Sequence, residues 1–528
     1  MSLPPFDRPF GAGASAEFAP GSLTTEFSLT REELRDLDPG PRMAQALASA
    51  ARDAKRGAIF ASIPWAAKQF LAVRAHELDH LHRMLSTTFG FLTDVIRCEW
   101  LKQSGRLIRE RAESPSKSLY PLLSLPKSKA KTFDEALREI ERPSETVSPT
   151  ARLVMGQTNL LAALTDTVSP PRFASALWGL SNAQPDRVHR LRSRPDGSNV
   201  SPPVERTEIG RGLSARHLLE LFAIGEHGNG FLRTGSSLEE VVSLLGDAQQ
   251  EYSAAALAWN AAFPEAPPPR VGSHGSLEGD LMFDWYRLYH FELFIAADLA
   301  LWPPFFPVHG LGVDGELTWD DIDPGRRFER ILAALQELRI QPLPIPAEGR
   351  NERFLDIQDR VCRRYGWPTP QRLAGLWLGH LRNHRDGSAS TWFALDGHST
   401  YRVDNAVKLL ELRESRPADF ALNNVDFNAR GVEGAPVWIL RESDGRKAPL
   451  PMGKLESKLV LPLMMIEGTR HMFNRDRSML TPVYDAKFRE STVESLGRMM
   501  EVIADWGPGL LTRFLDETHR EFRTKYRR

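Results

Sequence analysis

The chain has 528 residues, of which 41% are hydrophobic and 26% charged, which is the balance of an ordinary globular protein and excludes a disordered or fibrous one. Its 67 Lys and Arg residues stand against 68 Asp and Glu residues, so the formal net charge of -1 favours neither nucleic acid nor an anionic membrane as a partner. A chain of this length exceeds one compact core, and at roughly 150 residues per domain we expect about two to four lobes.

The sequence favours a cytoplasmic protein. Its two cysteines, Cys98 and Cys362, are too few for a disulfide framework or a Cys-rich metal site. Residues 1–9 lack the basic and apolar regions of a secretory signal. The most apolar runs, residues 291–306 and 459–466, are too short to span a bilayer, so we expect no transmembrane helix.

Changes in composition divide the chain into four expected regions. Residues 1–27 are rich in Pro, Gly, Ser and Phe without periodicity, which favours a flexible N-terminal arm. Helical patterns follow over residues 28–190 and, after a loop rich in Pro and Gly, again over residues 191–345. Residues 346–528 are expected to form a C-terminal α+β region. The predicted fold class is therefore mainly α and multi-lobed, with a small β element in the C-terminal third.

The segment from Trp65 to about Arg111 contains no Pro and carries apolar residues at helical spacing, which predicts one long helix or two consecutive ones. Within it lies the motif His76-Glu77-Leu78-Asp79-His80. Residues four apart on a helix share one face, so His76 and His80 can direct two imidazoles at one point, with Glu77 beside them.

This motif has the residue types that a catalytic zinc site needs. Zinc binds neutral imidazole nitrogen well, and a catalytic site keeps one position open for a water molecule that the metal acidifies. Glu77 is then placed to take the proton of that water and pass it to a leaving group. The HExxH pattern of residues 76–80 resembles the zincin superfamily of metallopeptidases. That resemblance implies a zinc-dependent peptidase that acts on a peptide or protein substrate.

The third metal ligand has to come from another part of the chain. Arg83 and Ser86 stand where the longer metzincin motif has Gly and His, so a Glu from a later helix, the gluzincin arrangement, is the better template. We expect zinc to be held by His76, His80 and such a Glu. The separation of roughly 140 residues between His80 and the best candidate is longer than most gluzincins use.

That candidate is Glu220. Ser214 caps a predicted helix that runs to Glu226 and is expected to end at the glycines that follow it, Gly228 and Gly230. Glu220 begins a Glu-x-x-Ala step that looks like the third-ligand helix of gluzincin-type proteins. Glu226 and His227 are the alternates. In the competing interpretation Glu220 is simply a polar residue on the exposed side of an amphipathic helix.

Two later segments carry weaker signals. Tyr286, Tyr289, His290 and Glu292 lie on a predicted aromatic-rich helix, where a Tyr or His could stabilise an oxyanion but is more often part of the core. The run Val437 to Leu440 and the residues after Asp444-Gly445 predict a β-hairpin.

Two other functions remain open from the sequence. The same two His with a carboxylate could form the facial triad of a non-haem Fe(II) oxygenase of the 2-oxoglutarate-dependent kind. Alternatively, the chain is a non-catalytic helical scaffold in which the motif is incidental. The charged Asp79 at a middle position of the motif bears on this choice, because it indicates either a partner close to the ligands or a solvated helix face.

Overall fold

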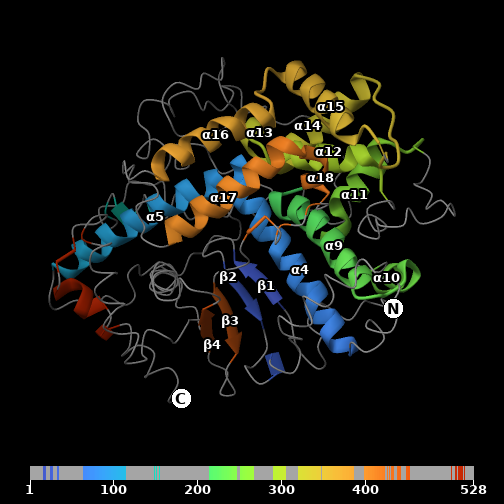
Figure 1. The fold of residues 1–528 in the computed structure, drawn as a ribbon. Helices are drawn as coiled ribbons and strands as arrows, with labels where there is room; N and C mark the ends of the chain where they lie inside the picture. The colour runs from blue at the N-terminus through green and yellow to red at the C-terminus, as the bar shows by residue number, and fades with distance from the viewer. Residues whose placement is uncertain are drawn as a thin grey trace, which may run out of the picture.

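The computed structural model describes residues 64–113, 213–245, 250–266, 289–304, 319–346, 348–385 and 398–422, with short stretches inside 16–34, 148–154, 425–451 and 501–517. These described residues are mainly α-helical, which confirms the predicted class at that level (Figure 1). Among them, no helix is both long and apolar enough to cross a membrane.

The segment that carries the motif forms two consecutive helices, α4 (Trp65–Ser86) and α5 (Thr88–Ala112). The break lies at Thr87, whose backbone is extended and whose hydroxyl accepts a hydrogen bond from the backbone N–H of Gly90 at 3.2 Å. Gly90 is required at this corner, because a Cβ atom there would lie 1.8 Å from the carbonyl oxygen of Met84. The absence of Pro predicts that this segment is helical. The break between α4 and α5 depends instead on the close approach of Gly90 to the backbone of Met84.

Helix α9 (Ala215–Arg233) begins after Ser214 as predicted, but it continues through the glycines at which the sequence predicts its end. The backbone N–H of Ser214 donates to His217 Nδ1 at 3.0 Å. At the other end, a Cβ atom on Gly230 would lie 2.7 Å from the Cα atom of Ala72 in α4. Gly230 therefore serves close helix packing, and the prediction that it ends the helix is wrong.

Helix α12 (Phe291–Ala300) lies at the centre of the helical packing, and all its residues are buried. Apolar residues occur all round this helix, and such a helix is expected in the interior of a large protein; its two acids, Glu292 and Asp298, are paired with arginines. The other helices, in chain order, are α10 (Leu238–Leu245), α11 (Gln250–Ala262), α13 (Trp319–Ile322), α14 (Pro324–Glu337), α15 (Arg350–Tyr365), α16 (Pro370–Arg385), α17 (His398–Ser415) and α18 (Pro417–Ala421).

The C-terminal end of α12 is capped by a buried arginine of α14. Arg327 donates to the carbonyl oxygens of Leu299 and Ala300, at 3.1 and 3.2 Å, and to that of Asp321 at 3.1 Å. The last carbonyl groups of a helix lack partners within it and attract a cation, so Arg327 satisfies them. Its guanidinium carbon lies 3.9 Å from the ring centroid of Trp367.

Four short strands form one sheet in the order β1-β2-β3-β4, where β1 (Ala16–Ala19) and β2 (Thr24–Phe27) pair antiparallel, β2 pairs parallel with β3 (Val437–Arg441), and β3 pairs antiparallel with β4 (Lys447–Pro451). Two of these strands lie within residues 1–27, which were expected to form an irregular arm. The composition of residues 1–27 does not predict these strands, because the parallel partner of β2 is far away in the sequence. Phe27 also packs in the core, with its ring centroid 5.6 Å from that of Phe70.

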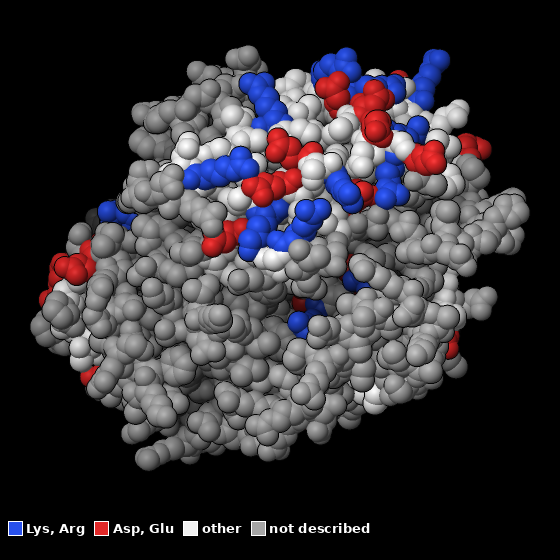
Figure 2. Space-filling model, in the orientation of Figure 1, with Lys and Arg blue, Asp and Glu red and all other residues white. Residues whose placement is uncertain are grey.

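Charges of both signs are mixed on the face of the described residues that Figure 2 presents. Three exposed arginines of α15 and α16 pair with nearby acids: Arg363 with Asp359 at 2.7 Å, Arg364 with Glu337 at 2.9 Å, and Arg382 with Glu411 at 2.6 Å. Exposed pairs of this kind contribute little to stability.

Candidate metal centre

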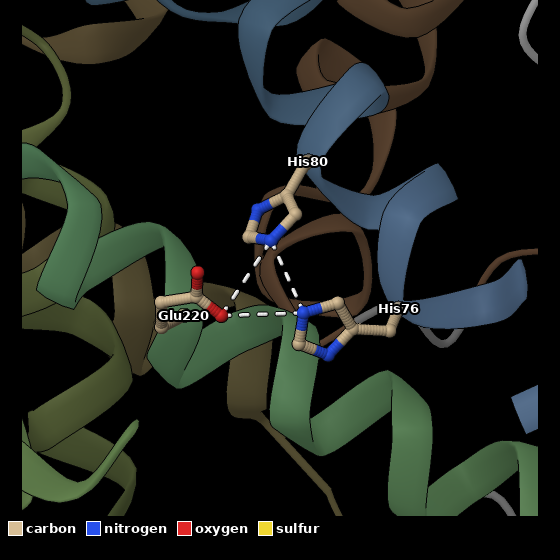
Figure 3. Close-up of side chains that lie close together, drawn as sticks. All are labelled: His76, His80 and Glu220. Carbon is tan, nitrogen blue, oxygen red and sulfur yellow. Dashed lines mark hydrogen bonds and ion pairs between the residues drawn. The ribbon is translucent and has the colours of Figure 1, made fainter. Parts of the chain in front are cut away.

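Helix α4 directs two imidazoles at one point. His76 and His80 are one helical turn apart, and their Nε2 atoms lie 3.2 Å from each other (Figure 3). Both residues are buried, with exposed fractions of 5% and 7%. The convergence that the spacing of the motif predicts is therefore present, and it lies inside the protein.

Helix α9 brings Glu220 to the same point. Glu220 Oε2 lies 3.2 Å from His76 Nε2 and 3.6 Å from His80 Nε2. Glu220 is 8% exposed, which contradicts the interpretation that places it on the solvated side of an amphipathic helix. The structure thus brings all three sequence-predicted ligands together, and among the described residues they form a group whose ligand atoms could hold a metal ion.

The pairing of α4 with α9 explains why residues so far apart in sequence meet. Trp65, at the start of α4, stacks on Phe231 near the end of α9 with ring centroids 5.4 Å apart. His76, further along α4, contacts His227, which lies earlier in α9, with ring centroids 5.7 Å apart. The contacts run in opposite directions along the two helices, so α4 and α9 pack antiparallel. Glu220, near the start of α9, therefore meets the later part of α4.

The three distances match a metal site. In a tetrahedron with metal–ligand bonds of about 2.0 to 2.2 Å, neighbouring ligand atoms lie roughly 3.3 to 3.6 Å apart. The separations among the two Nε2 atoms and Glu220 Oε2 are 3.2, 3.2 and 3.6 Å. Glu220 Oε2 is buried and makes no hydrogen bond of acceptable geometry to the described residues. The residues therefore fit a cation bound between them.

The electrostatics of the site keep Glu220 ionised. Burial acts to raise the pKa of the Glu220 carboxyl, but the adjacent imidazoles of His80 and His76 outweigh burial and lower that pKa below its ordinary range. The other carboxylate oxygen, Oε1, lies 3.8 Å from Nε of Arg216, which is on the same helix one turn earlier. A guanidinium on that side leaves Oε2 directed at the two imidazoles.

Glu77 follows the first histidine on α4. Its side chain is buried, with an exposed fraction of 5%. It is not one of the three residues whose ligand atoms converge, which are His76, His80 and Glu220. This division agrees with the motif, in which the two His hold the metal and the Glu between them is available for proton transfer.

Asp79, the unusual charged residue of the motif, is also buried. It is 1% exposed, and its Oδ1 accepts a hydrogen bond from Nε of Arg83 at 3.2 Å. The interpretation that this helix face is solvated is therefore wrong. Sequence reasoning missed Arg83 and its distant partner Asp298, although a carboxylate inside the apolar run of α12 is a signal that a buried cation lies nearby.

The alternates to Glu220 have other environments. Glu226 pairs with Arg233 at 3.2 Å and accepts a hydrogen bond from Asn229 at 2.9 Å, and burial raises the pKa of its carboxyl. His227 packs against the ring of His76, and its pKa is lowered well below the ordinary value by burial and by His76. Neither residue belongs to the converging cluster.

The aromatic segment considered for oxyanion stabilisation belongs to the core. Tyr286 lies outside the described residues. Burial raises the pKa of Tyr289 to about 12, and His290 accepts a hydrogen bond from Trp259 at 3.1 Å. Glu292 accepts a hydrogen bond from Arg353 at 3.0 Å. These side chains are committed to packing around the start of α12.

Comparisons with protein-family models, curated proteins and solved structures found no match to this chain. The resemblance to zincins therefore rests on residues 76–80 and on Glu220. The chemistry of the site follows from these side chains and from the residues that surround them.

Proposed function

We propose that the chain is a zinc-dependent metallohydrolase of the peptidase type. In this proposal His76, His80 and Glu220 bind Zn²⁺, and Glu77 is the general base. The observation that carries it is the convergence of two imidazole nitrogens and one carboxylate oxygen within 3.2 to 3.6 Å of one another in a buried position. A peptide or protein substrate is part of the proposal through the resemblance to zincins.

A bound cation accounts for this cluster better than hydrogen bonds alone. A neutral imidazole carries a single N–H, and an ionised carboxylate only accepts hydrogen bonds. Nε2 of His76 and Nε2 of His80 each carry at most one proton, so at most two of the three close contacts among these atoms and Glu220 Oε2 can be hydrogen bonds. A divalent cation accepts lone pairs from all three atoms and balances the charge of Glu220.

Zinc held by His76, His80 and Glu220 would supply a Lewis acid that acidifies a water molecule. The Glu77 carboxylate would be the group that accepts a proton and returns it to the leaving group. His76 and His80 bind as neutral ligands, and Glu220 provides the one negative charge of the set. Burial of the site excludes competing water, which strengthens each of these interactions.

A second candidate function rests on the same donor set. Two His and one carboxylate also make the facial triad of non-haem Fe(II) oxygenases. The identity of the metal decides between the two. The scaffold interpretation is less well supported, because the three side chains are buried and converge, whereas incidental His and Glu residues are typically solvated.

The wider expectations from the sequence remain part of the proposal. We keep the division into residues 1–27, 28–190, 191–345 and 346–528, and the small β element in the C-terminal third as a feature of an α+β region. A cytoplasmic location, and the lack of nucleic-acid or membrane partners, follow from the composition and are proposed on that basis.

The first experiment is metal analysis of the purified protein by inductively coupled plasma mass spectrometry. Zinc close to one equivalent in the wild type, and its loss in both His76→Ala and Glu220→Ala, is the expected result. Glu226→Gln is the matched control, because Glu226 is a buried carboxyl of the same helix outside the cluster, and it should retain zinc. Iron in place of zinc favours the oxygenase. A protein without bound metal excludes both enzymes.

A further inference from the structure

A network of buried charged side chains lies beside His76 and His80 on α4, and it has no role in the chemistry proposed above. It consists of two acids and two arginines whose side chains are at most 1% exposed: Asp79, Arg83, Asp298 and Arg413. Asp298 pairs with both arginines. The formal charges sum to zero, which allows the network to be buried.

All three nitrogen atoms of the Arg83 guanidinium lie close to oxygen atoms of neighbouring residues. Arg83 Nε donates to Asp79 Oδ1 at 3.2 Å, and Nη2 donates to the carbonyl oxygen of Ala421 in α18 at 2.7 Å. Arg83 Nη1 lies 3.8 Å from Oδ1 of Asp298 in α12. The guanidinium plane is thus tied at once to its own helix α4, to α12 and to α18.

The Asp298 carboxylate accepts hydrogen bonds from two other helices. Arg413 of α17 donates to both of its carboxylate oxygens, with 2.8 Å between Nη1 and Oδ1. Gln358 of α15 donates to Oδ2 at 3.0 Å. Because Asp298 accepts from two further helices, it anchors Arg83 to the helical packing around α12 and not only to α4.

The Arg83 guanidinium lies over an aromatic ring of α9. Its central carbon is 3.9 Å from the ring centroid of Phe222, which is fully buried. Phe222 is two residues beyond Glu220 on the same helix, while Arg83 is three residues beyond His80 on α4. Arg83 therefore contacts the helix of the third ligand within one turn of Glu220.

We propose that Arg83 is a positioning residue of the metal centre: held by Asp79 and Asp298, it fixes α9 through Phe222 so that Glu220 reaches the two histidines. This inference rests on the zinc site proposed above. A buried ion network is seldom a large net source of stability, because desolvation opposes the attraction between the charges. Its use here is to set an orientation, which the planar, multiply donating guanidinium does better than an ammonium group.

The test compares Arg83→Lys with Arg327→Lys. Arg327 is the matched control, because it is equally buried, donates to backbone carbonyls and lies 3.9 Å from an aromatic ring, that of Trp367. It joins α12 to α14 and does not contact the cluster. Zinc affinity is measured by competition with a chromophoric chelator, and the stability of the metal-free proteins by thermal unfolding.

We expect Arg83→Lys to weaken zinc binding by about ten- to a hundredfold, as loss of a residue that orients a ligand does. Arg327→Lys should lower thermal stability while leaving zinc affinity within about twofold of the wild type. Phe222→Leu keeps apolar bulk and removes the aromatic ring, and it should also weaken zinc binding. It serves as the test if Arg83→Lys does not fold.

Cobalt spectra supply a readout of geometry. If Arg83 positions Glu220, the visible spectrum of Co²⁺-loaded Arg83→Lys or Phe222→Leu should shift toward that of Glu220→Gln, whereas the spectrum of Arg327→Lys should match the wild type. Wild-type zinc affinity and an unchanged cobalt spectrum in Arg83→Lys, or in Phe222→Leu where the former does not fold, overturn the role of Arg83 and leave the metal site standing. Failure of the wild type to bind zinc or cobalt overturns the metal site and this inference together.

Discussion

Gly230 of α9 lies so close to Ala72 of α4 that a Cβ atom at position 230 would be 2.7 Å from the Ala72 Cα atom. Contact between two backbones cannot be relieved by rotating a side chain. The two helices that carry the proposed ligands are therefore too close at this point for any side chain at position 230. The metal centre depends on this separation, because α4 supplies both histidines and α9 supplies Glu220.

The first prediction concerns Gly230→Ala. The added methyl group should force α4 and α9 apart, lowering the free energy of unfolding by about 1 to 3 kcal/mol and weakening zinc binding. Gly375→Ala in α16 is the control, because no heavy atom lies within 4 Å of a Cβ atom built there. That change should raise stability by about 0.5 to 1 kcal/mol through helix propensity. Chemical denaturation of both variants measures the difference, and equal effects would contradict the packing described for Gly230.

The second prediction concerns metal removal. Zinc bound by His76, His80 and Glu220 joins α4 to α9, and a ligand that binds only the folded state stabilises it. Removing zinc should lower the free energy of unfolding by about 3 to 4 kcal/mol, relative to free zinc at roughly 100 to 1,000 times Kd. Differential scanning calorimetry with and without a chelator measures this loss. His76→Ala should be insensitive to the chelator, and a chelator effect in that variant would point to a different metal site.

The third prediction separates metal binding from proton transfer. Glu77→Gln should retain zinc, because Glu77 is not in the converging cluster, but should hydrolyse peptides at least about a hundredfold more slowly, because an amide cannot act as the base. Turnover of a peptide library, combined with metal analysis of the same preparation, measures both properties. If Glu77→Gln keeps full activity, another residue is the base. If it loses zinc, Glu77 supports the metal instead.

The fourth prediction concerns pH and Asp323, which caps α14. Burial raises the pKa of the Asp323 carboxyl from 3.8 to about 7, even though its Oδ1 accepts a hydrogen bond from the backbone N–H of Arg326. The folded state therefore holds a proton that the unfolded state releases, so the stabilisation from this group is complete below about pH 4 and is lost as the pH rises through about 7. The loss amounts to at most about 4 kcal/mol.

Asp323→Asn should remove this part of the pH dependence, because Asn caps a helix without titrating. Urea denaturation of the wild type and the variant between pH 4 and 8 measures the two slopes. Identical slopes would show that Asp323 titrates with an ordinary pKa in the folded state.

Features of the site that depend on local sequence were accessible without the structure. The placement of His76 and His80 on one face follows from helical periodicity, and Ser214 marks the start of α9 because a cap acts within one turn. From the sequence, the resemblance of the Glu-x-x-Ala step to a third-ligand helix favours Glu220 over Glu226. The distances that favour Glu220, and the pairing of Glu226 with Arg233, come only from the structure.

Other features required the tertiary structure because their partners are far apart in the chain. The sequence by itself determined that the protein is mainly helical, that residues 76–80 lie on a helix, and which residue types could bind a metal. Only the tertiary structure decided that α9 continues through Gly230, that β2 pairs with β3, and that Asp79 and Arg83 are buried with Asp298. Helical periodicity depends on residues that are close in sequence. Contacts between helix backbones and buried ion pairs form only when segments far apart in sequence pack together.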